Sequence, residues 1–519
     1  MPAHRRLKFT VFTACMLFIA VPGMAETPES WYQSGQAELE RALAYRQNTG
    51  LAKNIILFVG DGMGISTVTA ARIYDGQSRG QTGEENSLSF ESLPFLALSK
   101  TYNTNQQTPD SAGTMTAMMS GIKTKAGLIG LNQNAERANC RTSLDADIPT
   151  FLEQAEQAGL STGIVTTTRI THATPAATYA HIPERDWEDD ADLPTEAIED
   201  GCKDIAQQLI EFEFGNGIEV TMGGGRASFL PNTEIDPQTE RPGNRRDGRD
   251  LISEWQDKYK DGTYLWNREQ LAAVDPASTD RLLGLFSPSH MRYHQDRQGE
   301  TSAQPSLPLM TQKTIEILQK NPKGFFLMVE AGRIDHAHHA GNAQRALQDT
   351  SELSDAVNVA LALTNSEDTL IIVTADHSHT LTMAGYPTRG NPILGKVVSN
   401  DGAGNPESNP QLAEDQLPYT TLGYRNGRGF ATGMGGDTRY RTASDPGRKD
   451  LTKVDSTHPD YHQEALVPLD METHAAEDVA IYAGGPWAHL FQQTHEQHYI
   501  YHVMRHAAQL DLRAAPVDQ

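Results

Sequence analysis

Short runs of apolar, often β-branched residues alternate with longer amphipathic stretches along most of the chain. A strand buried on both faces of a sheet is continuously apolar, and a covering helix has one apolar face, so this alternation predicts an α/β fold with a largely parallel sheet between two layers of helices. The length allows one elaborated domain or two of ordinary size. The expected strands are 54–59, 163–167, 218–222, 324–329, 369–374 and 478–483, and the expected helices include 149–158, 202–213, 304–319 and 342–363.

Two segments depart from this rhythm. Residues 29–47 predict a helical N-terminal arm with apolar positions at Trp31, Leu39 and Leu43, which either packs on its own subunit or reaches a partner. Residues 387–468 are rich in Gly, Pro, Asn and Asp, and we interpret them as an insertion over the domain rather than a linker. We therefore expect a single catalytic domain over 26–519 that carries both features.

Residues 1–25 have the features of a secretory signal peptide: a basic start, an apolar run over 9–21, and small residues at Gly23 and Ala25. The apolar run is shorter than the roughly 20 residues that a membrane-spanning helix needs. The polar residues 512–519 do not form a lipid-anchor signal. We expect cleavage after Ala25 and a secreted or periplasmic protein with no membrane anchor.

Charge and cysteine content narrow the set of partners and compartments. The formal net charge of -24 argues against nucleic acid and anionic membranes as partners. Because Cys15 lies in the leader, Cys140 and Cys202 would remain in an oxidising compartment, either as one disulfide or as two buried thiols.

Acidic and histidine residues follow several of the expected strands, where ligands bind in open α/β sheets. Asp61 stands between glycines after the first strand, although such a residue alone is often a helix cap. The strand 324–329 leads into a run with three histidines in four positions, in which Asp335 and His339 are four residues apart and share one helix face. This pattern favours a divalent metal ion.

A second such group follows strand 369–374, and single candidates lie elsewhere. It contains Asp376, His377 and His379, whereas His474 stands alone before the last strand. Ser111 opens an expected helix, where an anion is stabilised, although by local sequence Asp110 or Ser111 could simply cap that helix. Carboxylates with imidazoles suit zinc, and carboxylates with a hydroxyl and water suit magnesium.

Together these motifs resemble the alkaline phosphatase family, over essentially the whole mature chain and in the version found in its animal-type branch. The resemblance implies a phosphomonoesterase in which Ser111 becomes phosphorylated and Arg185 binds the phosphate oxygens. A phosphodiesterase or nucleotide pyrophosphatase of the same superfamily is the alternative. The motifs are Asp61-Gly62-Met63-Gly64, Asp110-Ser111-Ala112, the run from Val329 to His339, the run from Thr374 to His379, and Thr473-His474-Ala475.

The resemblance also implies two Zn²⁺ and one Mg²⁺ per subunit, a disulfide between Cys140 and Cys202, and a homodimer with residues 387–468 as a crown-like part of its interface. We expect no calcium, because Ser287 and Gln304 stand where animal members carry acidic ligands. The implied ligands are Asp335, His339 and His474 for one zinc, Asp61, Asp376 and His377 for the other, and Asp61, Thr174 and Glu330 for magnesium, with His172 and His336 near the magnesium and the phosphate and His379 near a zinc.

Overall fold

The computed structural model describes residues 27–236, 238–297, 303–430 and 448–510. The expected signal peptide and the polar C-terminal residues lie outside these ranges. The chain divides into two compact units, Met1–Arg46 and Gln47–Gln519. Among the described residues, no helix combines the length and apolar character needed to cross a membrane.

The first unit contains one helix, α1 (Pro28–Ala44), where the N-terminal arm is expected. Thr27 caps it: its side chain accepts from the Ser30 backbone N–H, and the Ser30 side chain bonds back. None of its residues is buried, and Trp31, Leu39 and Leu43 are all more than half exposed. The apolar positions of the arm are therefore open to solvent in the single chain.

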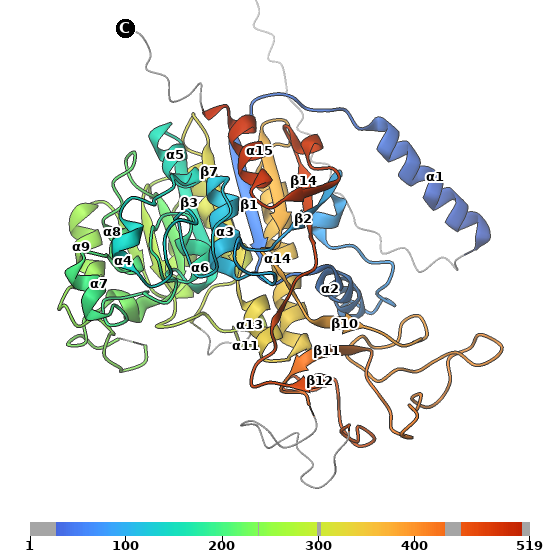
Figure 1. Cartoon of the computed structure of the whole chain (residues 1–519). Helices are drawn as coiled ribbons and strands as arrows, with labels where there is room; N and C mark the ends of the chain where they lie inside the picture. Colours follow the sequence, from blue (N-terminus) through green and yellow to red (C-terminus); the bar gives the residue numbers. More distant parts are fainter. Residues whose placement is uncertain (1–26, 237, 298–302, 431–447, 511–519) are drawn as a thin grey trace, which may run out of the picture. The chain divides into compact units, whose positions relative to one another are not determined.

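The second unit is built on a ten-stranded sheet with the order β15-β2-β14-β8-β1-β7-β3-β4-β6-β5 (Figure 1). Neighbouring strands are parallel except for β14, which is antiparallel to both β2 and β8. The strands are β1 (Asn54–Gly60), β2 (Phe95–Lys100), β3 (Ser161–Arg169), β4 (Val220–Gly224), β5 (Thr263–Leu265), β6 (Leu282–Leu285), β7 (Phe325–Ala331), β8 (Thr369–Thr374), β14 (Val479–Gly484) and β15 (Thr494–Glu496).

Helices cover both faces of this sheet, as the sequence predicts. Alternate residues of β1 enter two separate cores, with Ile55 and Leu57 on one face and Ile56 and Phe58 on the other. The first core is closed by α3 (Ser111–Ser120), α5 (Phe151–Gln157), α8 (Ile205–Ile210), α9 (Leu251–Lys258) and α15 (Tyr499–Ala508), and the second by α2 (Ile65–Ser78), α10 (Arg268–Ala273), α12 (Leu307–Leu318), α13 (Arg333–His339) and α14 (Ala343–Leu363).

Shorter elements complete the unit. A second sheet combines β10 (Leu381–Met383), β11 (Leu422–Gly427) and β12 (Ala465–Pro468), and a two-stranded one pairs β9 (Ser378–His379) with β13 (His474–Ala475). Two strands of the three-stranded sheet thus come from the segment interpreted as an insertion. The remaining helices are α4 (Cys140–Ser143), α6 (Ala173–Ala176), α7 (Thr195–Glu199) and α11 (His294–Arg297), with 3-10 turns at Ser89–Ser92, Arg226–Phe229 and Ala488–Leu490.

The two cysteines in the described part of the chain form a disulfide. Cys140 and Cys202 are 62 residues apart in sequence, and their Cα atoms lie 5.8 Å apart. Of the two alternatives that the sequence leaves open, the structure contains the disulfide rather than two buried thiols.

Candidate metal centre and active site

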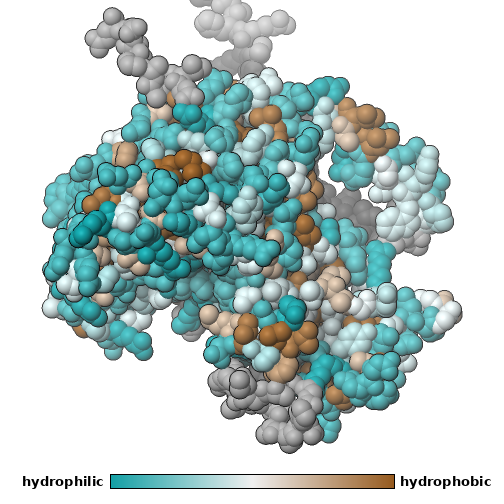
Figure 2. All heavy atoms as spheres, viewed as in Figure 1, coloured by the Kyte–Doolittle hydropathy of each residue, from teal (hydrophilic) through white to brown (hydrophobic). Residues whose placement is uncertain are grey.

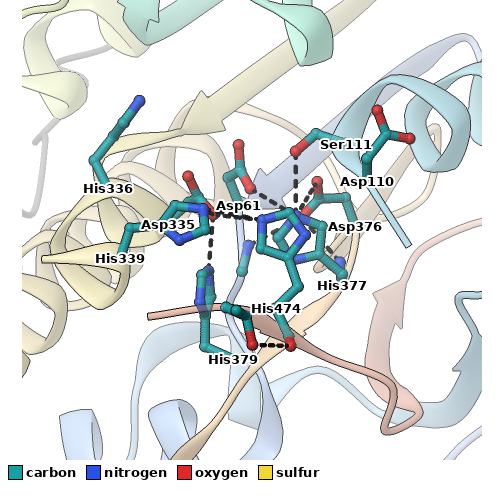
Figure 3. A network of polar contacts seen from close by, with 12 residues as sticks. Asp61, Asp110, Ser111, Asp335, His336, His339, Asp376, His377, His379 and His474 are labelled. Atoms are coloured by element: carbon teal, nitrogen blue, oxygen red, sulfur yellow. Dashed lines mark hydrogen bonds and ion pairs between the residues drawn. The ribbon is translucent and has the colours of Figure 1, made fainter. Parts of the chain in front are cut away.

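The site lies where three neighbouring parallel strands end. β1 lies between β8 and β7, with Val59 opposite Thr374 on one side and Glu330 on the other. The residues that follow these strands therefore meet at one edge of the sheet. Figure 3 shows that Asp61, Asp335 and Asp376, from three different strand ends, gather with several imidazoles below the Ser111 hydroxyl.

Asp61, Asp376 and His377 form a fully buried first group, in which all ligand atoms lie within 4.8 Å of one another. His377 Nε2 is 3.4 Å from Asp61 Oδ1 and 3.3 Å from Asp376 Oδ2. It is also 3.1 Å from Ser111 Oγ. The first group thus places a nucleophile beside three groups that can bind one cation.

The helix cap that the sequence left ambiguous is Asp110. Its Oδ1 accepts from the Gly113 N–H at 3.1 Å, and α3 begins at the next residue. The Ser111 side chain is therefore not used for capping, and its hydroxyl turns toward His377 at the N-terminus of the helix.

A second metal-capable group adjoins the first one and shares Asp61 with it. Ligand atoms of Asp61, His172 and Glu330 also lie within 4.8 Å of one another. Glu330 accepts from the Thr166 and Thr168 hydroxyls, the latter at 3.0 Å. Thr174 is fully buried on α6, two residues after His172.

Several buried polar atoms in these two groups have no hydrogen-bond partner, which is rare in proteins. Burial and the nearby Asp376 raise the pKa of Asp61 well above its usual value, and burial raises the pKa of Glu330 to about 7. Oxygen-rich sets of this kind are satisfied by divalent cations, so the residues present fit metal ions. The unpartnered atoms are both carboxylate oxygens of Asp61, Asp376 Oδ2, Glu330 Oε1, His172 Nδ1 and Thr174 Oγ1.

Three imidazoles converge on Asp335 in the remaining group. The Nε2 atoms of His379, His339 and His474 are 2.8, 3.2 and 3.3 Å from Asp335 Oδ1. The Nδ1 atoms of His339 and His474 lie 2.6 and 2.7 Å from backbone carbonyls, which can only accept. Each Nδ1 therefore carries the proton, and each Nε2 presents a lone pair to the centre, as metal ligation requires.

The sequence assigned no role to Glu472, which holds this imidazole group in place. The residue is buried, and its carboxylate accepts from His379 Nδ1 and from the Thr380 N–H and hydroxyl, each at 2.6 Å. Its backbone carbonyl accepts from His339 Nδ1. Its place two residues before His474 was the one feature of the sequence that could have indicated this role. The pairing of β9 with β13, which brings Glu472 to His379, cannot be predicted from the local sequence.

Two other histidines of α13 point elsewhere. His338 lies between the Thr67 hydroxyl and the Tyr424 hydroxyl, at 3.0 and 2.8 Å. The ring of His336 points away from Asp61, Asp335 and Asp376 (Figure 3), and its centroid lies 5.4 Å from that of His172 and 4.2 Å from that of His290. The histidine run therefore supplies the centre with one imidazole, from His339.

Arg185, the residue expected to bind the phosphate oxygens, faces the same cavity as Ser111. Arg185 lies 3.3 Å from Asp110 Oδ2 and 3.2 Å from His172 Nε2. Together with Ser111, His336 and the Asp335 group, it lines a cavity of about 540 Å³. Ser287 and Gln304 bond instead to the backbone, through His290 O and Arg292 N, and no metal-capable group found among the described residues includes them.

The site combines a serine hydroxyl, metal-capable groups and a guanidinium at the carboxyl edge of the sheet of an α/β fold. This combination is that of a metal-dependent hydrolase of phosphate esters. The chain belongs to the alkaline phosphatase family, whose family model matches residues 52–510. It is 45% identical over 503 residues to the tissue-nonspecific alkaline phosphatase of Homo sapiens, covering 95% of this chain and 91% of that protein. It is 44% identical over 494 residues to the alkaline phosphatase of Gadus morhua, covering 94% and 98%.

Solved structures show the same fold. The alkaline phosphatase of Thermus thermophilus superimposes with a TM-score of 0.61 at 23% identity, covering 89% of this chain and 93% of the other. That of the Antarctic bacterium TAB5 gives 0.57 at 21% identity, covering 89% and 99%. These structures confirm the expected fold class, and the family match with the relatives at 44–45% identity shows that the chain is an alkaline phosphatase, a metal-dependent phosphomonoesterase, as expected.

Proposed function

We propose that the enzyme transfers the phosphoryl group of a monoester to Ser111 and then to water, with two Zn²⁺ and one Mg²⁺ bound as the resemblance implies. The observation that carries this proposal is the Ser111 hydroxyl at the start of α3, 3.1 Å from His377 and beside carboxylate oxygens that lack partners. When bound, the metal ions would lower the pKa of the serine hydroxyl and stabilise charge on the phosphate and the departing oxygen.

The protein's own residues provide positioning. Ser111 Oγ forms a bond to phosphorus while the bond to the alcohol oxygen breaks, and water later cleaves the phosphoserine to release inorganic phosphate. Arg185 binds the phosphate oxygens and is itself held by Asp110 and His172. Glu472 and two backbone carbonyls fix the ring orientations of the imidazole group.

The charges of the proposed site balance. Asp61, Glu330, Asp335 and Asp376 contribute about -4, against roughly +6 from three divalent ions and +1 from Arg185. A phosphate dianion and a serine alkoxide bring about -3, so the loaded site is nearly neutral. The acidic surface is screened over about 10 Å in ordinary salt and does not prevent phosphate binding.

The covalent route is tested by Ser111→Ala. We expect p-nitrophenyl phosphate turnover to fall by at least about a thousandfold and no phosphoenzyme to be trapped at low pH. Ser120→Ala is the matched control, because this serine ends the same helix and bonds only to backbone groups nearby, donating to the carbonyls of Thr116 and Ile122 and accepting from the Ile122 N–H. Wild-type turnover by Ser111→Ala would exclude the phosphoserine intermediate.

The same proposal includes a secreted or periplasmic homodimer. Two features support it: the exposed apolar side chains of α1, and those of Leu466, Leu469 and Met471 at or beside β12. Figure 2 shows apolar side chains gathered over this small sheet. A mass of one chain by light scattering at working concentration would contradict the dimer.

A further inference from the structure

We propose that the mouth of the active-site cavity contains a binding subsite for a second anionic group, carried by the alcohol part of the phosphate monoester, and that Arg333 is its main contact. The inference rests on the proposed function, since it assigns a leaving-group preference to the same site. The chemistry recognised is a carboxylate or a further phosphate on the alcohol.

The charge of Arg333 is not compensated by the protein. Its guanidinium lies over the Tyr293 ring, 4.0 Å from the centroid, and lines the cavity. Its Nε is buried without a hydrogen-bond partner. In the described part of the chain, no acidic side chain forms an ion pair with Arg333. A partly buried cation in this state leaves its donors available to an anionic ligand.

Two other arginines of the cavity differ from Arg333 in this respect. Arg185 faces Asp110 at 3.3 Å, and Arg137 makes two hydrogen bonds of 2.8 Å to Glu184. Arg428 also lines the cavity and uses its Nε to donate to the backbone carbonyl of Asp470. Among the described residues no partner occupies its terminal N–H groups, and Arg428 is the secondary contact.

Arg333 and Arg428 line the same cavity as Ser111 and Asp335, so both can meet the alcohol part of an ester bound there. In phosphoryl transfer the attacking and departing oxygens lie roughly in line, so the alcohol departs on the side opposite Ser111. The Asp335 group adjoins the Ser111 group, and Arg333 precedes Asp335 by two residues on α13. Arg428 is bonded to Asp470, four residues before His474.

The acids of the cavity do not cancel this charge. Asp110 is bonded to Arg185, and Asp335 is surrounded by three imidazoles. Asp186 is the remaining acidic side chain on the lining, and it follows Arg185 directly. An anionic group near Arg333 therefore meets a planar guanidinium, held by stacking on Tyr293, that can donate two parallel hydrogen bonds.

The test compares glycerol 3-phosphate with 3-phosphoglycerate, whose alcohol parts differ only by a hydroxymethyl group and a carboxylate. For each enzyme the measured quantity is the ratio of kcat/KM for 3-phosphoglycerate to that for glycerol 3-phosphate. In Arg333→Gln we expect this ratio to fall about fivefold, through the KM for 3-phosphoglycerate. The kcat/KM for glycerol 3-phosphate should change less than about twofold.

Controls separate the subsite from a general disturbance. Arg137→Gln, at the same mouth but already paired with Glu184, should leave the ratio unchanged, and Arg333→Lys should retain part of it. Added salt should reduce the wild-type ratio more than that of Arg333→Gln. A ratio that is equal in wild type and Arg333→Gln would overturn the subsite. Failure of the wild type to hydrolyse either ester would instead overturn the proposed function itself.

Discussion

Buried carboxylates lie at both the carboxyl and the amino ends of the strands of the central sheet, here called its two edges. The two groups of carboxylates differ in the hydrogen-bond donors that they receive. At the carboxyl edge, both oxygens of Asp61 and one each of Asp376 and Glu330 have no hydrogen-bond partner. At the amino edge, Glu219 accepts from the Thr162 N–H at 2.7 Å, and one oxygen of Glu156 accepts from the Thr162 hydroxyl at 2.6 Å while its other oxygen has no partner. The start of a strand offers N–H donors, whereas its end offers carbonyls, which cannot stabilise a carboxylate.

The difference distinguishes buried acids whose negative charge must be compensated by a metal ion from buried acids that one proton can neutralise. Burial, together with the neighbouring Glu219, raises the pKa of Glu156 to about 8. One shared proton and a few donors therefore suffice at the amino edge. At the carboxyl edge, four acids lie among imidazoles, and divalent cations would provide the compensating charge.

Metal removal is the strongest test of this comparison. Exhaustive chelation should reduce p-nitrophenyl phosphate hydrolysis by more than about a thousandfold and lower the thermal unfolding midpoint, because the carboxyl-edge acids lose their counter-charge. Zinc and magnesium, returned separately and then together, should restore activity fully only in combination. Activity that survives complete metal removal, verified by elemental analysis, would show that the carboxyl edge is not a metal centre.

A pH series on the amino edge gives the next largest effect. Because the folded state raises the pKa of Glu156 above its unfolded value, folding binds a proton, and the resulting stability is lost as pH rises from about 4.5 through about 8. Glu156→Gln stays neutral, so its free energy of unfolding at pH 9 should exceed that of the wild type by on the order of 3 kcal/mol.

The measurement is urea unfolding of the metal-loaded enzyme at pH 5, 7 and 9. Glu407→Gln, at an exposed position, is the control and should follow the wild type at each pH. Parallel curves for Glu156→Gln and wild type would mean that Glu156 does not take up a proton on folding.

Glu472 offers a further test of the comparison between the two edges. It lies at the carboxyl edge, but its carboxylate accepts several hydrogen bonds. It should therefore orient imidazoles rather than hold a metal ion as its principal ligand. We expect Glu472→Gln to weaken zinc binding about tenfold, as measured by competition with a chromogenic chelator. Glu464→Gln, whose carboxylate bonds to Arg448 instead, should bind zinc like the wild type. Unchanged zinc affinity in Glu472→Gln would remove its positioning role.

The sequence predicts the buried part of the fold well. Continuous apolar runs identify β1, β7 and β8 to within two residues, because strands covered on both faces carry an unambiguous pattern. It does not identify β2, whose residues are alternately exposed and buried, or show that β14 runs antiparallel. Strand direction depends on the route of the connecting chain, which local composition does not encode.

The site was predictable in so far as its residues follow recognisable strands. The residues after β1, β7 and β8 gather as expected because parallel neighbours end together. The use of Asp110 rather than Ser111 as the cap, and the contact between Glu472 and His379, could not be predicted. Both depend on which of several equivalent polar side chains the tertiary packing selects.

The position of β14 between β8 and β2 means that the sheet and the site can be completed only late in the synthesis of the chain. Residues 479–484 join β2 and β15 to the other seven strands of the sheet, and His474 reaches the imidazole group just ahead of them. A nascent polypeptide that has not reached this point has neither a continuous sheet nor its last imidazole, and long-range pairings of this kind form late. With His474 in its proposed role as a metal ligand, catalysis begins only when almost the entire chain has been made.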